Sequence, residues 1–232
     1  MSQWQIDSKE YLERLGLNKE DFEKQLKFPK IENIRKIVPL REMREVRSIV
    51  PIDNDLLSYL IRKIRTLDGQ LPFKNSTIRQ VVTNPRQLKI GQRYVYRENY
   101  QALMENGVSD LFKNFLGEWA GLGNLLAYFV FGLDKEDDYS MACYMPPIIE
   151  IHGSKPLIMD GIHRNYICRQ SGLPTINALK VKNVEVPFPC SVRNWREIKV
   201  ISLEDKPKTL EDRYFDLNKN LFRDLKYLGI DG

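Results

Sequence analysis

The sequence predicts an α+β fold, in which a small mixed β-sheet is covered by additional helices. Residues 146–182 contain three short apolar runs, separated by turn residues and by one helical pattern, as expected for strands around a helix. Residues 53–67 and 210–227 carry apolar side chains at the three- and four-residue spacing of amphipathic helices. We therefore expect a sheet within residues 146–201, to which a strand at residues 93–97 could be added.

Two short helices are expected at the N-terminus. Asp7 or Ser8 can cap the first helix, and Gly16 is placed to end it. Asn18 can cap a second helix of about the same length. We interpret residues 1–30 as a helical extension of the main domain.

A cluster of arginines precedes the clearest helix of the chain. Arg41, Arg44 and Arg47 are spaced like one face of a helix, with glutamates beside them. A solvated helix with salt bridges is the favoured interpretation, and a basic surface for nucleic acid is the alternative. The helix at residues 53–67 follows, with Asp53 as its cap and its apolar stripe in the core.

The middle of the chain combines basic and aromatic residues. Residues 93–97 alternate arginine and tyrosine with valine, as a strand does. Arg86, Arg93 and Arg97 could contact nucleic acid beside these tyrosines, although a strand with one buried tyrosine face is the more frequent arrangement. Residues of about 108–135 are rich in aromatic side chains, and we expect them to form a helical insertion.

An acidic loop, a further strand and a C-terminal helix complete the expected elements of the chain. The acidic loop at residues 134–138 lacks the spacing of an EF-hand, so a solvated loop is favoured over a metal site. A strand is expected at residues 198–201, and a C-terminal helix within residues 206–232. Residues 31–205 would then form one domain that carries the helical insertion.

The stretch that carries most chemical information is Asp160-Gly161-Ile162-His163-Arg164. Gly161 stands where a strand turns sharply into a helix, a place that favours a residue without a Cβ atom. The N–H groups of a first helical turn have no partners within the helix, and the helix dipole adds partial positive charge there. With His163 and Arg164 in the same turn, the pattern predicts a pocket for phosphate, carboxylate or sulfate.

This stretch lies between an apolar strand and a short helix and is followed by Gly172-Leu173-Pro174; the arrangement resembles the ParB/sulfiredoxin-like superfamily. Its members carry motifs of the form DG-x-HR or GERR at this turn and bind nucleotide phosphates there: CTP in ParB proteins, ATP in sulfiredoxin and ADP in free serine kinases. The resemblance covers about residues 146–182. It implies that Gly161, His163 and Arg164 contact the phosphates of ATP, ADP or CTP, bound with Mg²⁺.

Several groups near this turn have alternative roles. His163 could donate to phosphate, act as a catalytic acid or base, or only satisfy a neighbouring polar group. Asp160 could cap the helix, act as a catalytic base or bind Mg²⁺. A further catalytic carboxylate could come from Glu42, Asp53 or Glu150. Sulfiredoxin chemistry is not expected, because the cysteine it requires in the turn is absent here.

Composition narrows the class of protein. The net charge of +5 arises from 36 basic and 31 acidic residues without a dense basic tail, so it is compatible with nucleotide or DNA partners without requiring either. Three cysteines without C-x-x-C spacing and only two histidines argue against a zinc site and indicate reduced thiols in a cytoplasmic protein. No apolar stretch is long enough to span a membrane. A homodimer is compatible with the sequence.

Three functions from different classes are consistent with these patterns. The first is a phosphotransferase or NTPase that uses ATP, ADP or CTP at the turn, and this is the function we favour. The second is a DNA-binding ParB-like protein, either nucleotide-switched or nuclease-like, whose affinity for DNA would depend on salt. The third is a module without catalytic activity that holds an anion only for structure.

Overall fold

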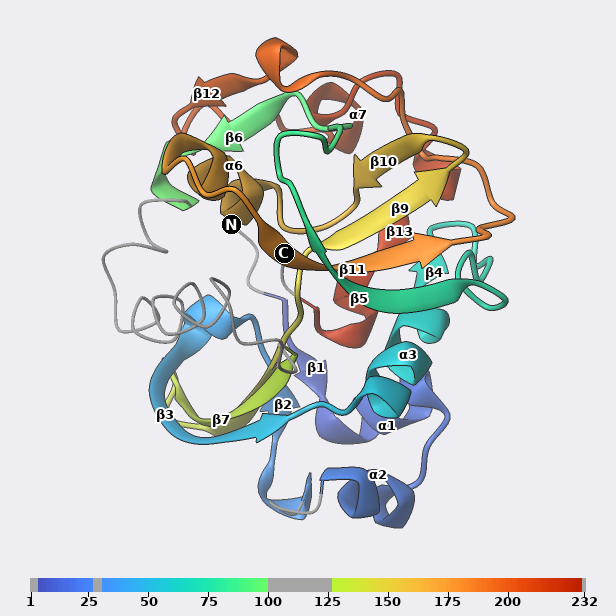
Figure 1. The fold of residues 1–232 in the computed structure, drawn as a ribbon. Helices are drawn as coiled ribbons and strands as arrows, with labels where there is room; N and C mark the ends of the chain where they lie inside the picture. Colours follow the sequence, from blue (N-terminus) through green and yellow to red (C-terminus); the bar gives the residue numbers. More distant parts are fainter. Residues whose placement is uncertain (1–3, 27–30, 100–126, 231–232) are drawn as a thin grey trace. The chain divides into compact units, whose positions relative to one another are not determined.

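The structure is a computed structural model that describes residues 4–26, 31–99 and 127–230. The chain divides into two compact units, each assembled from separate segments (Figure 1). Unit 1 comprises Met1–Arg65, Leu125–Met145 and Asp224–Asp231, and unit 2 comprises Thr66–Asn124 and Pro146–Arg223, together with Gly232. The short strands β4 (Arg65–Thr66) and β13 (Arg223–Asp224) lie where the chain passes from one unit to the other.

Unit 1 contains a five-stranded mixed sheet in the order β1-β2-β8-β7-β3. Only the β2–β8 pair is parallel; the other neighbours are antiparallel. The strands are β1 (Ile6–Asp7), β2 (Lys36–Ile37), β3 (Met43–Pro51), β7 (Tyr128–Asp134) and β8 (Tyr139–Tyr144). The helical elements are α1 (Ser8–Leu15), α2 (Lys19–Leu26), η1 (Ile31–Asn33), η2 (Leu40–Glu42), α3 (Asn54–Lys63) and η5 (Leu225–Leu228).

The N-terminal helices form as their sequence predicts. Asp7 caps α1 by accepting from the N–H of Lys9 at 2.8 Å, and Gly16 ends it with a φ of 68°. Asn18 accepts from the N–H at the start of α2 at 2.8 Å. Both helices contribute to the core of unit 1, where Phe22 makes an edge-to-face contact with Phe129 at 5.7 Å between ring centroids. Residues 1–26 are therefore part of unit 1 rather than a separate appendage.

Unit 2 contains a four-stranded mixed sheet in the order β10-β9-β11-β5. The strands are β5 (Thr77–Thr83), β9 (Ile148–His152), β10 (Lys155–Ile158) and β11 (Ile176–Lys182). β9 and β10 form an antiparallel hairpin, and helix α6 (Ile162–Gln170) then returns the chain so that β11 pairs parallel to β9 (Figure 1). This is the predicted succession of strand, hairpin, strand, turn, helix and strand.

The rest of unit 2 consists of short elements. β6 (Tyr94–Tyr96) and β12 (Lys199–Ile201) form a separate parallel pair. The helical elements are η3 (Trp195–Glu197), α7 (Leu210–Arg213) and η4 (Lys219–Leu221). The α+β class is thus as expected, with more than one mixed sheet. In the part of the chain that the structure describes, no helix combines the length and the apolar character needed to cross a membrane.

Two segments expected to be helical are strands. The residues that carry Arg44 and Arg47 belong to β3, where β-branched residues and Pro51 favour an extended chain paired with β7. The described end of the aromatic insertion is β7, which is rich in aromatic and β-branched side chains. The remainder of that insertion, residues 108–126, lies outside the described residues.

The C-terminal helix expected within residues 206–232 is also absent as a continuous element. Among the described residues of this segment, only α7 is α-helical, and η4, β13 and η5 follow it. Asp216 adopts a φ of 49°, a left-handed conformation that interrupts the leucine stripe. Tyr214 packs edge-to-face on Phe222 at 5.3 Å, so tertiary contacts replace the helical register. The strand at residues 93–97 forms as β6, but it pairs with β12, and the fourth strand of the main sheet is β5.

Candidate functional site

The predicted phosphate-binding turn lies between β10 and α6 in unit 2. The N–H of Met159 donates to the carbonyl of Ile148 at 2.8 Å, which holds the end of β10 against β9. Gly161 then adopts a φ of 81°, and a Cβ atom there would lie 2.9 Å from the Cβ of Pro147. Both the backbone conformation and the close approach of Pro147 require glycine at this position.

Helix α6 begins with backbone donors that have no partner among the described residues. Its N-cap is Gly161, which has no side chain to accept a hydrogen bond. The N–H groups of Ile162 and His163 make no hydrogen bond to any described residue. Helices α1 and α3, in contrast, are capped by Asp7 and Asp53. The first turn of α6 therefore presents two unpaired donors at the positive end of the helix dipole.

Asp160 and Arg164 form a buried ion pair at this turn. Arg164 Nη2 donates to Asp160 Oδ2 at 2.8 Å, and each residue is only 4% exposed. The guanidinium is therefore fixed in position, and one carboxylate oxygen is engaged with it. A metal ion at Asp160 would have to share this carboxylate with Arg164.

His163 is held as a neutral acceptor. The backbone N–H of Tyr96 donates to His163 Nε2 at 3.1 Å, and the two rings stack with centroids 5.6 Å apart. Burial, followed by the positive charges of Lys206 and Arg164, lowers the pKa of His163 to about 4. The proton of the neutral ring therefore lies on Nδ1, and His163 brings no positive charge to the turn at neutral pH.

Lys206, which the sequence did not single out, contributes to this site together with Tyr96. The Lys206 ammonium lies over the ring of Tyr96, 5.1 Å from its centroid, and Tyr96 also stacks on His163. Lys206 thus adds a positive charge close to the first turn of α6. The alternation in residues 93–97 indicated that one tyrosine would be buried, but nothing in the sequence connected Lys206 with a turn 43 positions away.

Asn165 adds a further unsatisfied group in α6. Its Nδ2 donates to the carbonyl of Gly161 at 2.9 Å, while its Oδ1 is buried and has no partner. A buried amide oxygen without a donor is uncommon in folded proteins. It lies in the second helical turn, directly after the residues of the predicted pocket.

The three arginines predicted to contact nucleic acid have different surroundings. Arg93 is anchored, because its Nε donates to the carbonyl of Tyr214 at 2.8 Å and its guanidinium lies over Phe215. Arg86 and Arg97 are exposed. Arg86 is close to a further arginine, Arg169, at the C-terminal end of α6.

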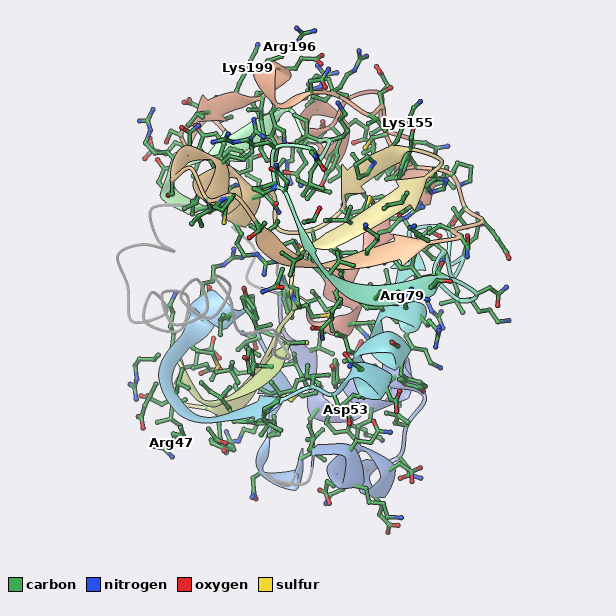
Figure 2. All side chains as sticks on the ribbon, in the orientation of Figure 1. Arg47, Asp53, Arg79, Lys155, Arg196 and Lys199 are labelled. Carbon is green, nitrogen blue, oxygen red and sulfur yellow. The ribbon has the colours of Figure 1, made fainter. Side chains whose placement is uncertain are left out.

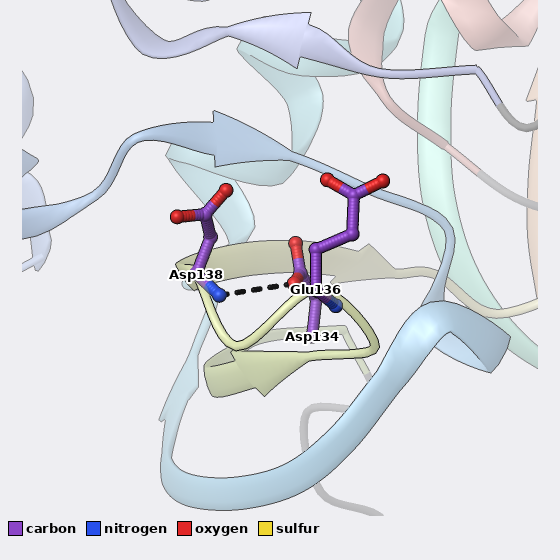
Figure 3. Close-up of side chains that lie close together, drawn as sticks. All are labelled: Asp134, Glu136 and Asp138. Carbon is purple, nitrogen blue, oxygen red and sulfur yellow. Dashed lines mark hydrogen bonds between the residues drawn. The ribbon is translucent and has the colours of Figure 1, made fainter.

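The acidic loop contains the one carboxylate cluster with metal-like spacing among the described residues. Asp134, Glu136 and Asp138 offer oxygens within 4.8 Å of one another (Figure 3). The Lys36 ammonium contacts all three carboxylates, at 3.0 Å from Asp134 and 3.2 Å from Asp138, and its pKa is raised, because these hydrogen bonds outweigh the desolvation of the ammonium. The chain therefore places its own cation where a metal ion would bind. The loop is an ordered turn held together by Lys36 rather than a freely solvated one.

The other carboxylates considered for catalysis are engaged in structure. Glu150 is fully buried and accepts from Arg223 through both oxygens, at 2.7 and 3.1 Å, while His152 Nε2 lies 2.6 Å from it. Asp53 caps α3 by accepting from a backbone N–H at 2.8 Å. Glu42 pairs with Lys135 at 3.1 Å. Each of them has a structural partner in the fold.

The cysteines show no sign of activation. Cys143, Cys168 and Cys190 are all buried and unbridged. Burial raises the pKa of Cys168 to about 11 and that of Cys190 to about 12, so both remain thiols at neutral pH.

Comparison with known proteins gives no family for the chain: no protein-family model, no curated protein and no solved structure matches it.

Proposed function

We propose that unit 2 binds the phosphate groups of a nucleotide at the N-terminus of α6, in the manner of ParB/sulfiredoxin-like domains. The observation that carries this proposal is the pair of unpartnered N–H groups of Ile162 and His163, which follow a glycine held in a left-handed conformation. Such donors at a helix N-terminus are suited to phosphate oxygens. The order of hairpin, turn, helix and parallel strand supports the resemblance seen in the sequence.

The surrounding side chains would assist through charge and position. Lys206 supplies a positive charge near the turn, and Arg164 is oriented by Asp160. His163 would offer at most a neutral Nδ1–H donor, because its Nε2 accepts from Tyr96. Since Asp160 is already paired with Arg164, a Mg²⁺ ion that arrives with the nucleotide would be held mainly by phosphate oxygens and water.

We favour phosphoryl transfer or nucleotide hydrolysis as the reaction. In this chemistry, positioning and neutralisation of phosphate charge do most of the work. The turn offers both through backbone donors and fixed cations. The buried Glu150 would take no part as a base, because both of its oxygens are bonded to Arg223.

The test is calorimetric titration of ATP, ADP and CTP with Mg²⁺ into the wild type and into Lys206→Gln. We expect one nucleotide to bind and its affinity to fall about tenfold in the variant, the size of one hydrogen bond to a charged group. Lys155→Gln is the control, since Lys155 is exposed on the β9–β10 hairpin and should leave binding unchanged (Figure 2). Arg164→Ala is less suitable, because it would leave Asp160 buried without its partner.

Two outcomes would contradict the proposal. The first is a wild type that binds none of the three nucleotides. The second is equal binding by Lys206→Gln and the wild type, which would place the nucleotide elsewhere. For a bound nucleotide, release of inorganic phosphate or of the diphosphate over time then decides whether the protein catalyses its turnover.

A further inference from the structure

A second cationic surface lies at the opposite end of α6, away from the turn. It consists of Arg86, Lys89, Arg169 and Arg196, which we call the basic patch. Arg86 and Lys89 lie on the loop after β5, Arg169 is in the last turn of α6, and Arg196 is on η3. All four belong to unit 2.

Hydrogen bonds join the three segments into one surface. Arg169 Nη1 donates to the carbonyl of Pro85, directly before Arg86, at 3.3 Å. Lys89 Nζ donates to Asn194 Oδ1 at 2.6 Å, close to Arg196 in the sequence. Reciprocal backbone bonds between Ile90 and Arg193, at 3.0 and 2.8 Å, hold the two loops together. The cations are therefore carried on a fixed framework.

Arg169 is held in place by one hydrogen bond and one ring contact. Its guanidinium lies over the indole of Trp195 at 4.8 Å, and its only hydrogen bond to a described residue is the one from Nη1 to Pro85. The remaining N–H donors of this planar group make no hydrogen bond within the described part of the chain. An arginine that is fixed by stacking loses little conformational entropy when it binds a phosphate.

The basic patch has few carboxylates close to its cations in the described chain, and the one directly beside Arg196 in the sequence, Glu197, accepts from the N–H of Asn194. None of its four cations forms an ion pair with a carboxylate of the described chain. By contrast, the nearby Arg193 pairs with Asp216 at 3.2 Å. Burial, and then the neighbouring charge of Arg86, lowers the pKa of Arg169, as expected for two adjacent guanidiniums without an anion between them. This local repulsion would be relieved by an external anion.

We propose that the basic patch docks the phosphate backbone of a nucleic-acid duplex. Four cations spread over three segments match a series of phosphates better than the compact phosphate group of one nucleotide. Single-strand binding sites add exposed aromatic rings for base stacking. The two loops of the patch carry one aromatic residue, Trp195, which is only 9% exposed and lies against Arg169, and this favours a duplex.

The proposal is independent of nucleotide binding at the other end of α6. The test is fluorescence anisotropy of a labelled 20-base-pair DNA duplex with the full chain over a series of salt concentrations. We expect the logarithm of the affinity to fall linearly with the logarithm of salt concentration. Arg86→Gln and Arg169→Gln should each weaken binding about tenfold and reduce the slope by about 0.9, the value for one lost phosphate contact.

A matched control uses the same substitution elsewhere in unit 2. Arg79→Gln removes an exposed arginine from β5, which lies apart from η3 and Arg196 in the view of Figure 2, and should leave affinity and slope unchanged. The single strands of the probe and polyglutamate serve as competitors. The proposal is overturned if the duplex does not bind, if Arg79→Gln weakens binding as much as Arg86→Gln and Arg169→Gln do, or if either competitor displaces the duplex at an equal concentration of charges.

Discussion

The acidic loop of unit 1 and helix α6 of unit 2 both concentrate charge, but they balance it differently. In the acidic loop, the Lys36 ammonium contacts all three carboxylates, so the cluster carries its own counter-ion. Among the described residues, helix α6 has N–H donors without a partner at its N-terminus, and at its C-terminus an arginine that forms no ion pair with a carboxylate. A charge cluster to which the chain itself supplies a counter-ion stabilises the fold, whereas one left unbalanced is available to a ligand.

The largest effect on stability is expected in the acidic loop, where Lys36 contacts all three carboxylates. Lys36→Ala removes the ammonium and leaves Asp134, which is 2% exposed, beside two further carboxylates. We expect a loss of about 3–5 kcal/mol in the free energy of unfolding, as for other broken buried ion pairs. Urea denaturation of the variant and the wild type measures this loss.

The same variant, Lys36→Ala, tests whether the Lys36 ammonium occupies the position of a bound cation. Without Lys36, the three carboxylates form a site of oxygen ligands suited to Ca²⁺. Millimolar Ca²⁺ should therefore raise the Tm of Lys36→Ala and leave that of the wild type unchanged. Equal responses of the two proteins would show that Lys36 does not occupy the place of a cation.

The next largest effect is the pH dependence of stability that His163 produces. Its pKa is about 4 in the folded protein and near 6.5 when unfolded, so the unfolded state binds more protons between these values. The contribution of His163 to stability is therefore complete above about pH 6.5 and is lost as the pH falls toward 4. By linkage, we expect a loss on the order of 2–3 kcal/mol across this window.

Denaturation at pH 7 and at pH 4.5 tests this expectation for the wild type and for His163→Gln. The glutamine variant should be less stable at pH 7, and its stability should change less between the two pH values. A wild-type curve that runs parallel to that of His163→Gln over this range would mean that His163 titrates normally in the folded protein.

A smaller effect is expected at the turn itself. Gly161→Ala introduces a Cβ atom 2.9 Å from Pro147 and forces a non-glycine residue to a φ of 81°. Residues held in such conformations cost about 1–3 kcal/mol. Gly153→Ala is a matched control, since Gly153 also has a positive φ of 58° but has no atom near its Cβ position. If the two variants lose the same stability, the approach of Pro147 adds nothing to the requirement for glycine at residue 161.

The sequence predicted best those elements whose ends are fixed by local chemistry. The caps Asp7, Asn18 and Asp53 and the succession of elements from Ile148 to Lys182 all follow from residues close to one another in the chain. β3 could not be predicted in this way, because its charged residues repeat with a helical spacing and its extended form depends on pairing with β7. Propensity is a weak guide when tertiary pairing decides the conformation.

The candidate site was predictable only in part for the same reason. Gly161 and Arg164 follow from a local pattern, whereas the contact of Lys206 with Tyr96 and the position of Arg169 beside Pro85 join distant segments. The neutral state of His163 likewise depends on its burial in the fold, where its Nε2 accepts from the N–H of Tyr96, 67 residues away. The sequence indicated positively charged residues at this turn but not which of them would remain charged after folding.

The discontinuous assembly of unit 1 has a consequence for synthesis. Its last segment is built into the core: Gly229 approaches Ile37 so closely that a Cβ atom would lie 2.6 Å from the isoleucine side chain, and Ile230 bridges to Cys143. In unit 2, β5 pairs with β11, whose residues emerge from the ribosome about a hundred positions later. Neither unit can complete its core before the C-terminal part of the chain has been made, and contacts so distant in sequence slow folding. The nascent protein therefore exposes unfinished sheets until residues 176–230 have been made, and its yield should depend on chaperone capacity more than on the stability of the finished fold.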